Sequence, residues 1–129
     1  DQALYFGRNN DGSWVSKVPM KVDVALMDRG QERFNIYCAA CHTRTGDGTK
    51  SQISKRGWVI PNLLQDLTVK RSDGELFDII SNGVRTMPGY RKQVSEQDRW
   101  AIVAYLRALQ QVKRGRLSDV PRQLRNKIN

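Results

Sequence analysis

The sequence predicts a single all-α domain, and three observations support this prediction. The chain has 129 residues, the length of one domain. Apolar residues recur every three or four positions before residue 38 and again after residue 96, a spacing typical of helices. Both cysteines and the only histidine lie in one run of five residues, Cys38-Ala39-Ala40-Cys41-His42. These features indicate a small helical domain organised around a C-x-x-C-H motif.

A C-x-x-C-H motif is typical of covalent haem attachment. Two thiols on one helical turn form thioethers with the vinyl groups of a haem, and the adjacent imidazole then lies under the iron as an axial ligand. The motif therefore predicts one haem c, attached at Cys38 and Cys41 and ligated by His42.

Two other interpretations of the motif are considered. A thiol-disulfide pair of the thioredoxin kind uses the same cysteine spacing, but such pairs accompany a βαβ pattern, which the sequence around residue 38 does not show. A structural zinc ion needs four protein ligands, and the motif supplies three. Haem attachment explains the motif better than either.

The first 24 residues are expected to form an extended arm. They hold three separated aromatic residues, Tyr5, Phe6 and Trp14, among turn-forming residues, and they show no sustained period. Three large aromatic side chains favour burial, so we expect the arm to dock on a partner rather than to stay disordered.

A haem domain is expected over residues 25–110, and it begins with a helix from about Asp23 or Val24 to Cys38. Glycine inside a helix costs about 1 kcal/mol relative to alanine. We therefore expect Gly30 to mark a close crossing with another helix. Phe34, one turn later, would flank that crossing.

The last helix is predicted from Glu96 to about Gln110, with Ser95 as its cap. Its broad apolar face indicates that it packs against the first helix. We expect Ile102 and Tyr105 to contact Gly30 and Phe34.

Three segments between these helices are expected to surround the haem. Residues 43–48 form a turn, and residues 49–56 are expected to be an exposed loop. Residues 57–63 then bring apolar groups together, among them Trp58 and Leu63, which we expect to contact the haem. The second ring nitrogen of a ligating histidine needs an acceptor, and the carbonyl of Pro61 is the candidate for His42.

A capping box, Ser72 to Glu75, predicts a short helix that ends at Asn82-Gly83. The chain then enters a loop that cannot stay helical through Pro88, and this loop contains Met87 and Tyr90. We expect Tyr90 to contact the haem.

Met87 is the predicted second ligand of the iron. The chain has no second histidine, so a sulfur ligand remains. Met20 and Met27 precede the motif, whereas Met87 follows His42 by 45 residues and can return across the opposite face of the haem. Ligation by histidine and methionine leaves no open position, which suits electron transfer rather than oxygen chemistry, so we expect no catalysis by this chain itself.

The formal net charge of +9 is concentrated in a basic C-terminal tail, residues 111–129. The last twenty residues hold six basic residues and one acidic residue, whereas residues 30–109 carry a net charge of +4. Aliphatic residues alternate with the basic ones, so we expect the tail to anchor the protein to a neighbour. The compartment implied by covalent haem disfavours nucleic acid as a partner.

Several motifs together resemble a class I cytochrome c over about residues 25–110. They are Gly30, Phe34, the C-x-x-C-H motif, Pro61-Asn62-Leu63, Met87-Pro88 and Trp100 to Leu106. The resemblance implies a small all-α fold whose first and last helices cross at Gly30, and it supports Pro61 as the partner of His42.

Residues 29–38, Gly46-Asp47-Gly48 and residues 99–110 also resemble the monohaem cytochrome c subunit of alternative complex III, a bacterial quinol-oxidising complex. This resemblance implies a peripheral place on the periplasmic side of a bacterial inner membrane. There the subunit would receive electrons from multihaem cytochrome subunits and pass them to a terminal oxidase or a soluble carrier. Membrane contact would be indirect or through a lipid anchor that precedes residue 1.

The sequence leaves other functions open. A free periplasmic carrier would need neither the arm nor the tail. A haem enzyme or gas sensor would need the iron to be free of Met87. We expect a subunit of a membrane complex rather than either of these functions, because two extensions flank a complete haem domain.

Overall fold

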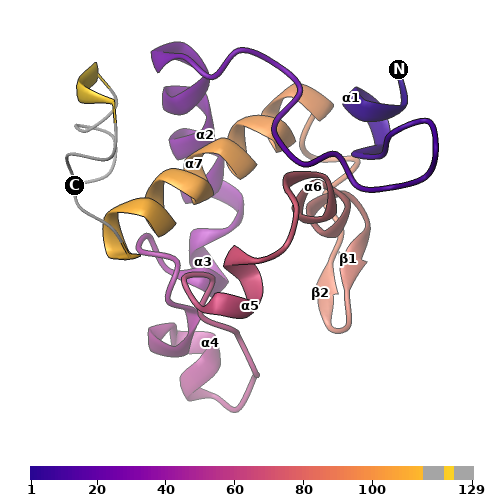
Figure 1. The fold of residues 1–129 in the computed structure, drawn as a ribbon. Coiled ribbons are helices and arrows are strands. Elements are labelled where there is room, and N and C mark those ends of the chain that lie inside the picture. The colour runs from indigo at the N-terminus through magenta and orange to yellow at the C-terminus, as the bar shows by residue number, and fades with distance from the viewer. Residues whose placement is uncertain (115–120, 124–129) are drawn as a thin grey trace.

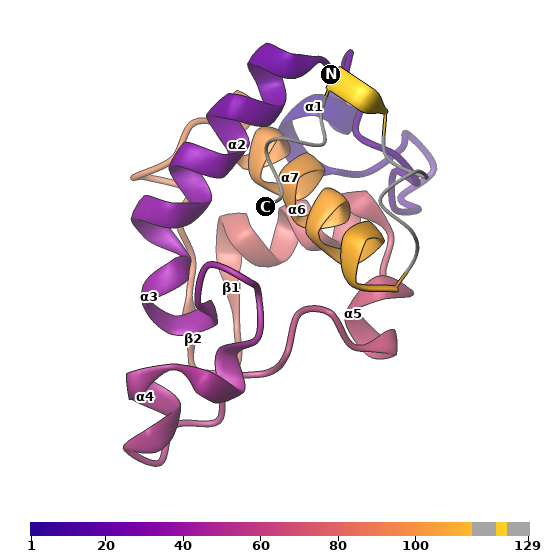
Figure 2. The same cartoon turned by 90° about the vertical axis from the view of Figure 1, so that its left-hand side faces the viewer.

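The computed structural model describes residues 1–114 and 121–123, and most of the predicted tail lies outside the described residues. The chain forms a mostly helical domain with a small hairpin (Figures 1 and 2). In chain order the elements are α1 (Gln2–Phe6), α2 (Val24–Tyr37), α3 (Ala39–His42), the 3-10 helix η1 (Gly48–Lys50), α4 (Gln52–Lys55), α5 (Asp66–Val69), α6 (Asp73–Asn82), β1 (Gly83–Val84), β2 (Met87–Pro88) and α7 (Glu96–Arg114).

The centre of the fold is the crossing of α2 and α7, seen in both views (Figures 1 and 2). A Cβ atom added at Gly30 would lie 2.1 Å from the carbonyl oxygen of Ala101 and 3.0 Å from the Cβ of Tyr105. The predicted close crossing at Gly30 is confirmed, but the backbone it meets is that of Ala101 rather than Ile102. Phe34 packs on Tyr105 as expected, with 5.6 Å between ring centroids.

Local capping explains where the two long helices begin. The carboxylate of Asp23 accepts the N–H of Leu26 at 2.8 Å, and Cys38 follows the last residue of α2. The hydroxyl of Ser95 accepts the N–H of Asp98 at 3.2 Å. Both helices therefore begin as predicted, and α7 continues past residue 110 to Arg114.

Helix α6 starts and ends as predicted, but without the capping box. Ser72 stands at the N-cap and makes no side-chain capping bond. Glu75 pairs with Arg71 instead of reaching back to the helix start. The helix is held by burial of its apolar face, which includes Leu76 and Phe77.

The N-terminal segment is not an extended arm, which corrects our prediction for residues 1–24. Its first turn is α1, and the segment packs on its own domain beside α6 (Figure 1). The indole N–H of the fully buried Trp100 donates to the carbonyl of Leu4 at 2.8 Å. The N–H of Gly74 donates to the carbonyl of Val15 at 2.8 Å. The segment thus buries apolar surface within the chain.

The predicted exposed loop at residues 49–56 is also more ordered than expected. It contains η1 and the single-turn helix α4, whose start is capped by the Ser51 hydroxyl bonded to the N–H of Ser54 at 3.1 Å.

Among the described helices, none combines the length and apolar character needed to cross a membrane.

Candidate functional site

The C-x-x-C-H motif lies where α2 ends and α3 begins. The N–H of Cys38 donates to the carbonyl of Phe34 at 2.8 Å and so closes α2, and the N–H of His42 donates to the carbonyl of Cys38 at 2.9 Å. Cys38, Cys41 and His42 therefore share one helical turn. The two cysteines form no disulfide, and Cys38 is buried and Cys41 half-buried. This is the spacing that two thioether bonds to one haem require.

The environment of Cys38 argues against a redox pair or a zinc ligand. Burial, with a smaller contribution from Cys41, raises the pKa of the Cys38 thiol to about 12. A thiol with this pKa stays protonated at neutral pH, whereas a redox pair needs the thiolate. In the described part of the chain, no group of three or more His, Cys, Asp or Glu side chains is placed to hold a metal ion.

His42 is 8% exposed, and its Nδ1 is buried without a hydrogen bond of standard geometry. Burial lowers the pKa of His42, while the carbonyl of Pro61 acts on the ring in the opposite direction and raises it. The ring is therefore neutral at neutral pH, the form that ligates a metal. An orphaned ring nitrogen beside a carbonyl fits a histidine that serves an iron on its other side, so these residues fit a haem.

Residues 60–64, which we call the strap, run beside the turn that follows His42. The N–H of Leu63 donates to the carbonyl of Gly46 at 2.8 Å. A Cβ atom at Gly48 would lie 2.9 Å from the carbonyl oxygen of Pro61. The Pro61 carbonyl also acts on the His42 ring, so Pro61 lies near His42 as predicted, and Leu63 is half-buried against the core.

Two other residues predicted to contact the haem differ in their surroundings. Trp58 is 56% exposed, and its role stays a prediction. Tyr90 lies near the motif: its pKa is raised first by burial and then by the neighbouring Cys38 and Cys41. Its ring also meets Tyr37 edge-on, with 6.1 Å between centroids.

Met87 lies in β2, opposite Val84 in β1, and is half-buried. The two other methionines already have places in the α2–α7 core, because Met27 is 2% exposed and Met20 packs against the same cluster. Met87 therefore remains the predicted second ligand.

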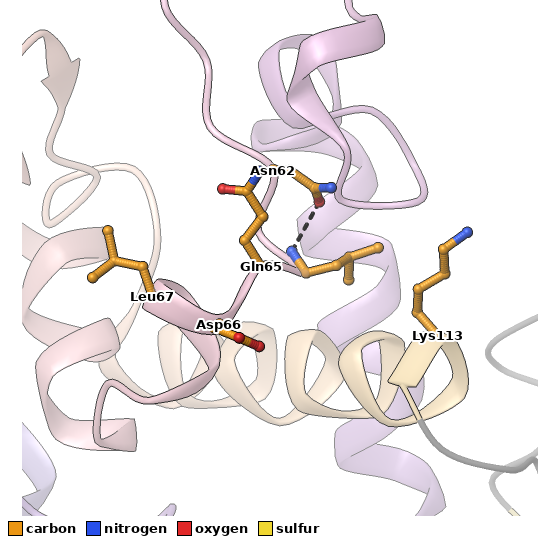
Figure 3. A pocket seen from close by; sticks show the side chains of 6 residues that line it. Asn62, Gln65, Asp66, Leu67 and Lys113 are labelled. Carbon is orange, nitrogen blue, oxygen red and sulfur yellow. Dashed lines mark hydrogen bonds between the residues drawn. The ribbon is translucent and has the colours of Figure 1, made fainter.

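A depression of about 610 Å³ lies outside the strap and is distinct from the predicted haem site (Figure 3). Its lining combines Asn62 and residues 64–67 with Lys113 of α7. The side chain of Asn62 accepts the N–H of Leu64 there at 2.9 Å, which stiffens the strap locally. None of the motif residues and neither Met87 nor Tyr90 lines this depression.

The sequence did not reveal three residues around the strap and the motif. Tyr37 was assigned only to the helix pattern, although its ring packs on Tyr90. Arg107 and Gln110 were assigned to the last helix, yet both are hydrogen-bonded across the fold. Two polar residues three positions apart on a strongly apolar helix were the available signal.

The fold and the motif agree with known proteins. Residues 25–106 match the family described as cytochrome C oxidase, cbb3-type, subunit III. The chain belongs to this family of c-type cytochromes. A cytochrome c6-like protein of a Nostoc species is 30% identical over 90 residues, which cover 67% of this cytochrome and 71% of the relative.

A solved structure has a similar fold. It is a chain of the reducing HAO-like protein complex of Kuenenia stuttgartiensis, with a TM-score of 0.59 and 18% identity. The match covers 84% of this cytochrome and 54% of that chain, so the cytochrome spans about half its length. At this identity the likeness concerns the fold alone.

This protein is therefore a monohaem, class I c-type cytochrome with an all-α fold and covalently bound haem c. The haem supplies an iron that gains and loses one electron, and the chain holds the haem and controls its surroundings. The predicted site residues are Cys38 and Cys41 for attachment and His42 and Met87 for the iron.

Proposed function

We propose that this cytochrome is a subunit of a quinol-oxidising membrane complex of the alternative complex III kind. It would sit peripherally on the periplasmic side of a bacterial inner membrane. It would receive electrons from a multihaem cytochrome and pass them to a terminal oxidase or a soluble carrier. The resemblance of residues 29–38 and 99–110 to such a subunit supports the proposal, as does a family description that names a subunit of an oxidase.

The observation that carries the proposal is what this chain adds to the family domain. The N-terminal segment precedes the matched residues 25–106. Its helix α1 is fixed to the domain by the hydrogen bond from Trp100 to the carbonyl of Leu4. Tyr5 and Phe6 are nevertheless 45% and 46% exposed. Two neighbouring aromatic side chains fixed on a rigid surface favour contact with another protein.

The charge distribution along the sequence adds a second argument, which concerns the other end of the chain. Residues 1–29 are electrically neutral overall, whereas the last twenty residues carry a net charge of +5. An exposed ion pair contributes little and weakens in salt. We therefore assign attachment mainly to apolar contacts of α1, with the basic tail contributing orientation.

The test is retention of the full-length holoprotein in the membrane fraction at rising salt. We expect the double variant Tyr5→Ser, Phe6→Ser to be released at lower salt than the wild type. Each buried aromatic contributes roughly 1.5–3 kcal/mol, and 1.4 kcal/mol corresponds to about tenfold in affinity. The matched control is Ile36→Ser, which removes an apolar side chain that is 57% exposed on α2. Equal retention of the double variant and the wild type would remove α1 as the tether.

Deleting residues 1–22 is a poorer experiment than these substitutions. The deletion would leave the indole N–H of Trp100 without the Leu4 carbonyl, so loss of binding would be confounded with damage to the core. A chain that ends at Arg114 tests the tail instead, because α7 stays complete.

A free periplasmic carrier is the alternative, and one observation favours it. The N-terminal segment is hydrogen-bonded to α6 through the carbonyl of Val15 and buries the Val15 side chain within the domain, so it has a place on its own domain without a partner. Recovery of the intact holoprotein in the soluble fraction at low salt would support the carrier and contradict the complex.

A further inference from the structure

The side chain of Gln110 links α7 to the strap. It is 4% exposed although it is polar. Its Nε2 donates to the carbonyl oxygen of Leu63 at 2.9 Å, and its Oε1 accepts from Arg107 Nη1 at 2.8 Å. Both ends of the buried amide are therefore satisfied, and one of them holds backbone of the strap.

Arg107 fixes which way the Gln110 amide points. A guanidinium only donates hydrogen bonds, so the amide oxygen must face Arg107 and the amide NH₂ must face Leu63. Arg107 is itself immobilised, because its Nε donates to Asp73 Oδ1 at 2.7 Å and its Nη1 donates to the carbonyl of Val69 at 3.2 Å. Its Nη2 donates to the carbonyl of Arg71.

Asp73 completes the network at its far end. It is 5% exposed, and its second oxygen accepts the N–H of Val18 at 3.0 Å. The half-buried charge of Arg107 is thus matched by the buried carboxylate of Asp73, and neither group is left unpaired. The network forms a rigid frame around Gln110 that is built from α5, α6, α7 and the N-terminal segment.

The strap is held from both sides as a result. The N–H of Leu63 donates to the carbonyl of Gly46, and its carbonyl accepts from Gln110. Asp47 and Asn62 also form a backbone bridge. The backbone next to Pro61 is therefore fixed between the turn after His42 and the last helix.

We propose that Gln110 is a positioning residue for the haem: it clamps the strap to α7 and so keeps the Pro61 carbonyl at the ring of His42. An acceptor at the outer nitrogen of a ligating imidazole makes the ring a stronger donor to the metal. A stronger donor favours ferric over ferrous iron and lowers the reduction potential. Gln110 would thereby hold the potential down without touching the haem.

This inference depends on covalent haem and on ligation by His42, and not on the partner. Its test therefore gives the same answer whether the cytochrome belongs to a complex or is a free carrier. Release from membranes would contradict the proposed function and leave this result unchanged.

The experiment compares Gln110→Met with Gln111→Met in the full-length holoprotein. Methionine matches the length of glutamine but cannot hold the Leu63 carbonyl, and Gln111 is an exposed neighbour on the same helix. We expect Gln110→Met to raise the reduction potential and to speed hydrogen exchange at the N–H of Leu63. The control should show the wild-type potential and the wild-type exchange rate.

A purely structural role predicts a different result. In that case Gln110→Met would unfold more easily or exchange faster at Leu63 and would keep the wild-type potential, which would overturn the proposal. If the methionine variant does not retain haem, Gln110→Asn replaces it, because asparagine is one methylene too short to reach Leu63. Loss of haem from both variants would also reject a positioning role, because the clamp would then serve folding alone.

Discussion

The α2–α7 crossing and the motif side of the molecule are built in opposite ways. At the crossing, helices of 14 and 19 residues bring their backbones together, and Trp100, Ala101 and Val103 are fully buried. Around the motif, α3 and α4 have four residues each, and the strands of the hairpin have two. Thr43 and Arg85 there adopt positive φ angles of 59° and 51°.

This difference separates what the chain stabilises by itself from what it prepares for the haem. Helices of four residues are unstable alone, because nucleating a helix is unfavourable. The short elements are held instead by single hydrogen bonds, such as those of Leu63. The crossing should therefore respond to changes in packing, and the motif side to changes in ligation.

Loss of a cysteine has the largest expected effect and breaks the motif side. Cys38→Ser or Cys41→Ser should leave at most one thioether, and the double variant should leave none. The measurement is the haem that stays with the polypeptide after acidic organic extraction. Full retention of acid-stable haem in both single variants would contradict covalent attachment at the motif.

Loss of the methionine ligand has the next largest effect. Met87→Ala should open the iron to carbon monoxide and remove any sulfur-to-iron charge-transfer band of the oxidised protein. Met20→Leu is the control, because Met20 packs in the core and should leave the spectrum unchanged. An unchanged spectrum in Met87→Ala would show that Met87 is not the second ligand. The interpretation as a haem enzyme or gas sensor, which needs the iron to be free of Met87, would then have to be considered again.

The two regions also differ in how far the sequence predicted them. The bounds of α2 followed from periodicity, which depends on residues close in sequence. The Gly30 crossing was predictable because one glycine inside that helix indicates a close contact, although its partner lies far away in sequence. The haem motif was readable for the same reason. The exact neighbour, Ala101 instead of Ile102, depends on the rotation of α7, which a broad apolar face does not fix.

Apart from the capping box, which failed for a local reason, the missed features depend on contacts between distant segments. Helix α1 is five residues long and is held by Trp100, almost a hundred positions away. A helix this short has no periodic pattern from which it could be predicted. The predicted capping box does not form, because Glu75 makes an ion pair with Arg71 instead of bonding to the start of the helix. Gln110 meets Leu63 only once α7 and the strap are assembled. The roles of Met87 and Trp58 stay predictions.

A side chain at Gly30 tests the crossing and should have a moderate effect. Gly30→Ala should lower the free energy of unfolding by roughly 1–3 kcal/mol through overpacking. Helix propensity alone predicts the opposite sign, a gain of up to about 1 kcal/mol. Denaturant unfolding measures the difference, and Ile36→Ala is the control because Ile36 is exposed on the same helix. A stabilised Gly30→Ala protein would show that the helices can move apart at little cost.

The smallest effect is expected at the rim of the crossing, where Arg29 joins α2 to α7. Its Nε and Nη2 donate to the two carboxylate oxygens of Asp98 at 2.9 and 3.0 Å, but its side chain is 48% exposed. Arg29→Gln should therefore lower the free energy of unfolding less than Gly30→Ala does. Most of the loss of stability caused by Arg29→Gln should vanish at about 0.5 M salt, where the Debye length falls to a few ångströms.

Asp98 also has a second role that Arg29 lacks. It stands in the first turn of α7, where a carboxylate interacts favourably with the helix dipole. Asp98→Asn should therefore destabilise the protein more than Arg29→Gln, and the double variant should be little worse than Asp98→Asn alone. Comparing the unfolding of all three variants separates the ion pair from the dipole, because only Asp98→Asn changes the charge at the helix start. If the effect of Arg29→Gln persisted in high salt, the rim contact would be a packing contact of the crossing rather than an exposed ion pair.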